Sequence, residues 1–168
     1  ISDSFEGKVY RGDVSQHAKK CKSPKVPIYE NYRYAIALPP GYVDADRLYP
    51  VLYMFGDFTS TRKQEMAGLA QKGMLDGTLP FMLLVFLKEN ETNLVDSIIP
   101  QLESHYGARM GYRFRALIGF EEGGVAALKN ALVPETFTSC VLFDAPITTD
   151  LLKEAITANK TAFKRTWF

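Results

Sequence analysis

The sequence has few of the residues that would indicate a disulfide-rich fold, a metal site or a nucleic-acid-binding surface. Its 168 residues include only two cysteines and two histidines, and its net charge is +1. Cys21 and Cys140 do not make a disulfide framework, and neither has the spacing of a metal-ligand set, so we expect two free thiols. A net charge so close to zero gives no electrostatic basis for binding nucleic acid or a charged membrane surface.

The sequence also lacks a long apolar run. The longest one, residues 81–87, is far too short to span a bilayer and is typical of a buried parallel strand. No signal peptide is visible, and the first residue is Ile1 instead of Met. We therefore expect no membrane insertion and an N-terminus that was processed or trimmed, while the compartment stays open.

Apolar residues make up 46% of the chain, which is enough to bury one core. Segments typical of strands alternate with segments of helical periodicity. We expect strands at 5–11, 32–38, 50–55, 81–87, 114–118 and 140–143, and helices at 61–72, 92–106, 122–131 and 148–158, with Pro100 interrupting the second helix. This alternation predicts an α/β fold with a mostly parallel sheet and helices on both faces.

We expect one domain over residues 1–168, with an N-terminal strand and arm at 1–29, a core at 30–146, and a C-terminal helix and tail at 147–168. Residues 14–29 are basic and contain two prolines, which favours a loop. The last expected strand, 140–143, has no expected neighbour on its outer side, and proteins normally cover such an apolar edge. We expect the terminal helix, another chain or the aromatic tail to cover it, the tail being Phe163, Trp167 and Phe168.

A glycine-rich turn is the most informative motif. Gly119-Phe120-Glu121-Glu122-Gly123-Gly124 follows the expected strand 114–118 and precedes the expected helix 122–131. Small residues on both sides of a central residue, between a strand and a helix, form a nucleophile elbow, in which the central residue projects into the active site. Here Glu121 stands where a serine is expected.

Three further segments belong with this turn. Residues 32–42 read Y-R-Y-A-I-A-L-P-P-G-Y, residues 48–57 read L-Y-P-V-L-Y-M-F-G-D, and a stretch with a proline turn and a phenylalanine follows at 131–141. In this order and spacing the chain resembles the esterase D / feruloyl esterase branch of the α/β-hydrolases, over residues 5 to 146. The resemblance implies a truncated α/β-hydrolase fold, because two further strands usually follow in that family.

The resemblance also implies a catalytic serine, acid and histidine, in that order along the chain. No histidine follows Glu121. His17 lies in the N-terminal arm, and His105 is expected at the end of a helix, where a histidine interacts favourably with the helix C-terminus. Asp144 could mimic the acid of the triad, but a turn residue before Pro146 is the favoured interpretation.

The oxyanion loop is altered as well. The His-Gly pair of the family aligns with Phe55-Gly56 or with Gly56-Asp57, and an aspartate there opposes the stabilisation of an oxyanion. A carboxylate nucleophile at Glu121 is less favoured, because the resulting ester would still need a histidine-activated water for its release. A metal site formed by Glu121 and Glu122 is less favoured, because carboxylates are generally stabilised at a helix N-terminus. We expect no catalytic residue, no cofactor and no metal. The vestigial elbow comprises Gly119, Glu121, Glu122 and Gly123, and the vestigial oxyanion loop comprises Phe55, Gly56 and Asp57.

Three functions stay open at this point. The leading hypothesis is a catalytically inactive esterase-like domain, a structural or interaction subunit whose partners are other protein chains. It predicts an interface at strand 140–143, at the C-terminal tail or at the basic arm 19–25. The second is a carboxylic ester hydrolase whose missing triad residues lie outside this chain. The third is a small-molecule binding module that uses a pocket lined by Tyr53, Phe55, Phe58 and Phe120.

Overall fold

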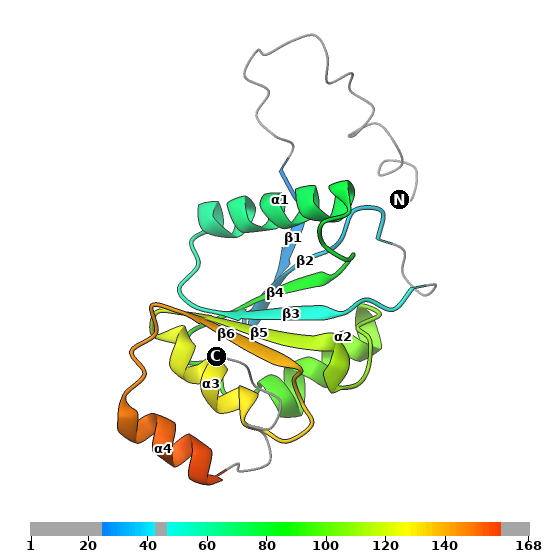
Figure 1. The fold of residues 1–168 in the computed structure, drawn as a ribbon. Helices are drawn as coiled ribbons and strands as arrows, with labels where there is room; N and C mark the ends of the chain where they lie inside the picture. Colours follow the sequence, from blue (N-terminus) through cyan, green and yellow to red (C-terminus); the bar gives the residue numbers. More distant parts are fainter. Residues whose placement is uncertain (1–24, 43–46, 159–168) are drawn as a thin grey trace.

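The structure is a computed structural model, and it describes residues 25–42 and 47–158 (Figure 1). The expected strand at 5–11, most of the basic arm, His17, Cys21 and the aromatic tail lie outside these ranges. No helix in the ranges described is both long and apolar enough to cross a membrane.

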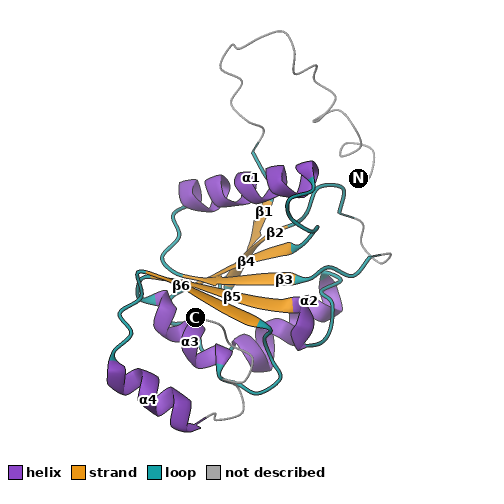
Figure 2. Cartoon of the chain, viewed as in Figure 1, coloured by secondary structure: helices purple, strands orange, loops and turns teal. Residues whose placement is uncertain are grey.

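The described residues form one six-stranded sheet with helices on both faces (Figure 2). Its strands lie in the order β1-β2-β4-β3-β5-β6, and β4, β3, β5 and β6 run parallel while β1 and β2 are antiparallel additions. The strands are β1 (Ile28–Glu30), β2 (Tyr34–Ala37), β3 (Val51–Phe55), β4 (Leu83–Leu87), β5 (Arg115–Phe120) and β6 (Ser139–Phe143). The predicted α/β fold with a mostly parallel sheet is confirmed.

The burial of the central strands explains why they could be predicted from the sequence. All five residues of β4 and four of the five residues of β3 are buried, as is typical of a strand covered by helices on both faces. β1 is a correction, since residues 14–29 were expected to form a loop. Its three residues pair with β2, but Tyr29 and Glu30 are exposed, so a three-residue strand of mixed polarity carries no readable alternation.

The helices divide between the two faces of the sheet. α1 (Ser60–Asp76) packs on one face, through Ala67 and Met74 among others, and α2 (Ile99–His105) and α3 (Gly123–Ala131) pack on the other. α4 (Thr149–Ala158) follows β6 on the same side as α3 (Figure 1). The interruption predicted at Pro100 coincides with a change of helix type, from the π-helical turn η2 (Leu94–Ile98) to α2. The short 3₁₀ turn η3 (Tyr112–Phe114), which leads into β5, was not predicted.

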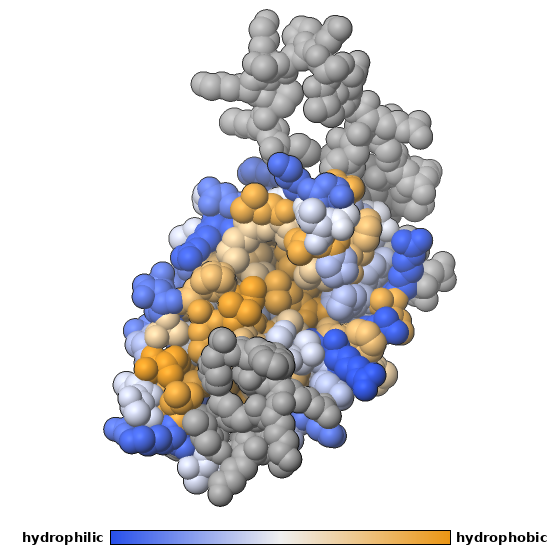
Figure 3. Space-filling view, viewed as in Figure 1, coloured by the Kyte–Doolittle hydropathy of each residue, from blue (hydrophilic) through white to orange (hydrophobic). Residues whose placement is uncertain are grey.

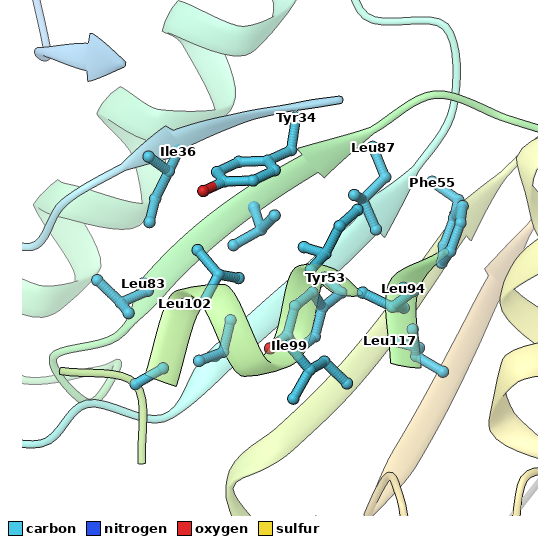
Figure 4. Close-up of a cluster of buried hydrophobic side chains, with 14 of the residues drawn as sticks. Tyr34, Ile36, Tyr53, Phe55, Leu83, Leu87, Leu94, Ile99, Leu102 and Leu117 are labelled. Atoms are coloured by element: carbon cyan, nitrogen blue, oxygen red, sulfur yellow. The ribbon is translucent and has the colours of Figure 1, made fainter. Parts of the chain in front are cut away.

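The larger of the two core layers lies between the sheet and α2 and α3 (Figure 4). Leu94, Ile98 and Leu102 of this helical segment are fully buried against Tyr53 and Phe55 of β3. This layer holds β3 and β5 in a fixed position relative to α3, and the two strands support the site described next.

Candidate functional site

The turn between β5 and α3 has the strained geometry of an elbow. Glu121 has φ = 50°, in the left-handed region that costs a non-glycine residue roughly 1–2 kcal/mol. Two backbone hydrogen bonds hold it there: the N–H of Glu121 donates to the carbonyl of Phe143 at 2.9 Å, and the N–H of Gly124 donates to the carbonyl of Glu121 at 2.9 Å. The chain therefore keeps this conformation although the central residue is a glutamate.

The glycines around Glu121 are required by close approach. A Cβ atom added to Gly119 would lie 2.5 Å from Cα of Gly124, and one added to Gly123 would lie 2.5 Å from the carbonyl group of Phe55. A Cβ on Gly124 would lie 2.2 Å from that of Ala145. The elbow thus packs closely between the end of β3 and the segment after β6. A side chain at any of these three positions would overlap neighbouring atoms and displace the elbow.

The loops that follow β3 and β5 diverge at the carboxyl ends of these two strands. β3 continues into α1 on one face, and β5 continues into α3 on the other. The gap between two such loops, at the carboxyl ends of parallel strands, is where α/β proteins generally bind ligands. Glu121 and the segment Gly56-Asp57 lie on the two sides of this point.

The side chain of Glu121 faces solvent and a cation. It is 67% exposed, and its carboxylate lies 3.9 Å from the guanidinium of Arg62, in the first turn of α1. Arg62 also lies over the ring of Phe120, 5.4 Å from its centre. Sequence reasoning missed Arg62, because the contact becomes visible only when α1 is placed over the end of β5.

The N–H of Gly56, at the start of the loop after β3, is already used within the sheet and is not free to bind an oxyanion. The N–H of Gly56 donates to the carbonyl of Leu87 at 3.2 Å, which extends the pairing of β3 with β4. Asp57 is exposed. Beside this loop is an open hollow of about 560 Å³, lined in part by Tyr32, Arg33, Phe58 and Lys88.

The residues suggested for a pocket are only partly at this hollow. Phe58 lines it, whereas the side chains of Tyr53 and Phe55 are fully buried in the core layer under α2 and α3. Phe120 is half-buried and packs edge-on against Phe58. The pocket predicted from the four aromatics is therefore wrong for Tyr53 and Phe55, because alternation along β3 turns both to the face covered by α2 and α3.

The only histidine among the described residues lies away from the elbow. His105 ends α2, and its Nδ1 lies 2.9 Å from the carbonyl oxygen of Gln101 and 2.7 Å from Oγ of Ser104. Ala108, three residues later, pairs with Tyr49, just before β3. This is the amino end of the parallel strands, and the six residues of β5 separate it from Glu121 by about 20 Å.

Asp144 and Glu122 lie at the carboxyl ends of the parallel strands, as Glu121 does. Asp144 follows β6 directly, is exposed, and has φ = 50°, which fits the turn residue expected from the sequence. Glu122 is exposed and immediately precedes α3. In the part of the chain that the structure describes, no three His, Cys, Asp or Glu side chains cluster in a way that could hold a metal ion.

Comparisons with known proteins give a fold but no family. No protein-family model matches the chain, and no curated protein matches it. Among solved structures, a ferulic acid esterase superposes with a TM-score of 0.59 at 18% identity over 67% of this chain and 52% of its own. The feruloyl esterase module from Clostridium thermocellum gives 0.60 at 15% identity, over 84% of this chain and 63% of its own.

An IroE-like serine hydrolase from Shewanella oneidensis is similar as well, with a TM-score of 0.56 and 20% identity, over 74% of this chain and 51% of its own. This chain thus spans between half and two thirds of the length of these three structures. At such identities the likeness concerns the fold alone. The chain therefore has the mostly parallel α/β fold of α/β-hydrolase-like esterases, with a glutamate at the centre of its elbow.

Proposed function

We propose that this chain is a catalytically inactive esterase-like domain that acts as a structural or protein-interaction subunit of a larger assembly. The observation that carries the proposal is Glu121 at the strained centre of the elbow, exposed and paired with Arg62. Ester hydrolysis by this fold needs a nucleophile, a base within hydrogen-bond reach and an oxyanion hole.

Separate contacts at the elbow, at the histidine and at Gly56 support this proposal. The carboxylate of Glu121 contacts a cation and has no base beside it among the described residues. His105 lies near the amino end of the parallel strands, away from the elbow at their carboxyl end. The N–H of Gly56 is bonded within the sheet. A kept scaffold without this machinery favours a role in which the fold itself is used, because function resides in sites and not in folds.

Native mass spectrometry of the gently purified protein tests the interaction role. The proposal expects the chain to appear in a complex whose mass exceeds that of one chain. A lone monomer at the concentration found in its source contradicts the proposal. Co-purified masses then identify whether the partner is another protein or a second copy.

The hollow beside Gly56-Asp57 supports a second candidate, a small-molecule binding module. Tyr32, which is 78% exposed, and Phe58 supply ring faces there. The charged side chains of the lining are mixed: Arg33, Lys63 and Lys88 stand beside Glu30, Asp57 and Glu89. Exposed aromatic rings suit an aromatic ligand, and ferulate is a convenient probe because ferulic acid esterases share the fold. Ferulate should raise the melting temperature of the wild type and not of Tyr32→Ala. Leu69→Ala, which alters an exposed residue of α1, is the matched control, and an unchanged wild-type melting temperature removes this candidate.

A further inference from the structure

The two outermost strands of the sheet that the described residues form, β1 and β6, differ in how they are protected. β1 is three residues long, follows Pro27 directly, and carries Glu30, which forms an ion pair with Lys63 at 2.6 Å. A short strand, a proline and charged side chains are the features by which proteins keep an edge strand from pairing with another chain.

The other edge has none of these features. β6 (Ser139–Phe143) contains five residues without a charge or a proline, and within the described ranges it pairs with β5 alone. Val141 is 47% and Phe143 50% exposed. Apolar side chains gather over the sheet between α1 and α3 in the view of Figure 3. Among the described residues, β6 is thus an apolar edge strand without a partner on its outer side.

The backbone of β6 has groups ready for a partner strand. The carbonyl of Phe143 accepts from the N–H of Glu121, so Phe143 turns its backbone groups to β5. Because these groups alternate along a strand, the N–H and C=O groups of Cys140 and Leu142 point away from β5. A strand that donates and accepts at these two positions would extend the sheet.

We propose that β6 pairs antiparallel with β6 of a second copy of this chain, about a two-fold axis through Val141. In this register Val141 lies opposite Val141 of the second copy, and Cys140 and Leu142 form the hydrogen-bonded pairs. The axis keeps each face of the sheet continuous, so Val141 and Phe143 stay on one face and Cys140 and Leu142 on the other.

Charge and closure favour a second copy. Asp144 lies opposite Thr138 of the other copy, so no like charges meet in the register centred on Val141. Pairing of β6 with β1 of another copy would give an open filament, but β1 is the protected edge. Pairing of β6 with itself closes after two copies and leaves the protected edges outside.

This inference rests on the proposed interaction role and names its partner as a second copy. A cysteine pair tests the register directly, in full-length chain with Cys21→Ser and Cys140→Ser. In Val141→Cys the two thiols would face each other at a Cα–Cα distance of about 4.5 Å, within the range of a disulfide. In Phe143→Cys, the matched control, four residues separate the two thiols, roughly 13 Å.

We expect Val141→Cys to form a covalent dimer under mild oxidation and Phe143→Cys to stay uncrosslinked. Sedimentation should show the wild type as a dimer, Val141→Lys as a folded monomer, and Leu69→Lys as a dimer. A monomeric wild type, or equal crosslinking by both cysteines, overturns the proposed dimer. A monomer that co-purifies with another protein overturns the dimer but not the interaction role, whereas ester turnover by a crosslinked dimer overturns the inactive-domain proposal alone.

Discussion

Arg62 and Glu121 join the first turn of α1 to the elbow, with the guanidinium 3.9 Å from the carboxylate. Both side chains are largely accessible to water, at 43% and 67% exposure, so solvent screens their attraction. The same guanidinium lies over the ring of Phe120. A glutamate at the elbow is therefore compatible with the fold, because its charge stays in water beside a cation.

Replacing Glu121 should change stability little. We expect Glu121→Ala to shift the free energy of unfolding by less than about 1 kcal/mol, because an exposed ion pair contributes about 0–1 kcal/mol. Urea denaturation of the wild type, of Glu121→Ala and of Arg62→Ala, the matched control, measures this shift in the free energy of unfolding. A loss of several kcal/mol in Glu121→Ala alone would mean that the carboxylate has a structural partner beyond Arg62.

The glycines of the elbow should tolerate no side chain. Gly123→Ala should lower the free energy of unfolding by more than about 2 kcal/mol, because its Cβ would overlap the backbone at Phe55 and that backbone cannot move without opening β3. Gly68→Ala in α1 is the control, since a Cβ there meets nothing within 4 Å. It should raise stability by about 0.5–1 kcal/mol. Equal effects in chemical denaturation would refute the close packing of the elbow.

The parts of this site that could be read from the sequence are those fixed by local chemistry. The turn at Gly119–Gly124 was recognisable because a tight strand-to-helix turn requires glycines at set positions, and β3 and β4 because buried parallel strands are continuously apolar. His105 was placed at the end of its helix by its position after the apolar periodicity.

Contacts between residues far apart in the chain could not be predicted from the sequence. The contact of Arg62 with Glu121 joins residues 59 positions apart and depends on how α1 crosses the sheet. β1 was missed because three residues show no periodicity. The placement of Tyr53 and Phe55 away from the hollow depends on which side chains of β3 point to the face covered by α2 and α3.

Removing the hydroxyl of Tyr53 should stabilise the protein or leave it unchanged. The hydroxyl is buried without a hydrogen-bond partner among the described residues, near the partly buried pair of Glu103 and Arg115. An unsatisfied buried polar group costs about 1–3 kcal/mol. Tyr53→Phe should therefore raise the melting temperature, whereas Tyr34→Phe should lower it because the Tyr34 hydroxyl interacts with Asn31 and Tyr106. A lower melting temperature for Tyr53→Phe would show that the hydroxyl has a partner.

Stability should decline in alkaline solution. Burial raises the pKa of the Cys140 thiol from 9.0 to about 12, and burial also raises the pKa of Tyr53 above its ordinary value. Both groups are neutral below pH 9, so their contribution is fully present there. It is lost as the pH rises from about 9 towards 12, because the unfolded chain ionises first.

Urea denaturation between neutral pH and pH 11 measures this loss. Cys140→Ala and Tyr53→Phe should each flatten the decline above pH 9, and Tyr29→Phe, which alters an exposed tyrosine, should leave the slope unchanged. A wild-type profile that stays flat up to pH 11 would contradict the burial of these groups.

The central claim is that the chain keeps the elbow and has lost its chemistry, and ester hydrolysis by the full-length protein tests it most directly. Wild type, Glu121→Ala and Glu121→Ser are assayed with a short acyl ester and with a feruloyl ester, after circular dichroism shows that all three are folded. We expect no turnover above the buffer rate in any of them, because a serine alone has no base beside it. Turnover by the wild type that disappears in Glu121→Ala would contradict it.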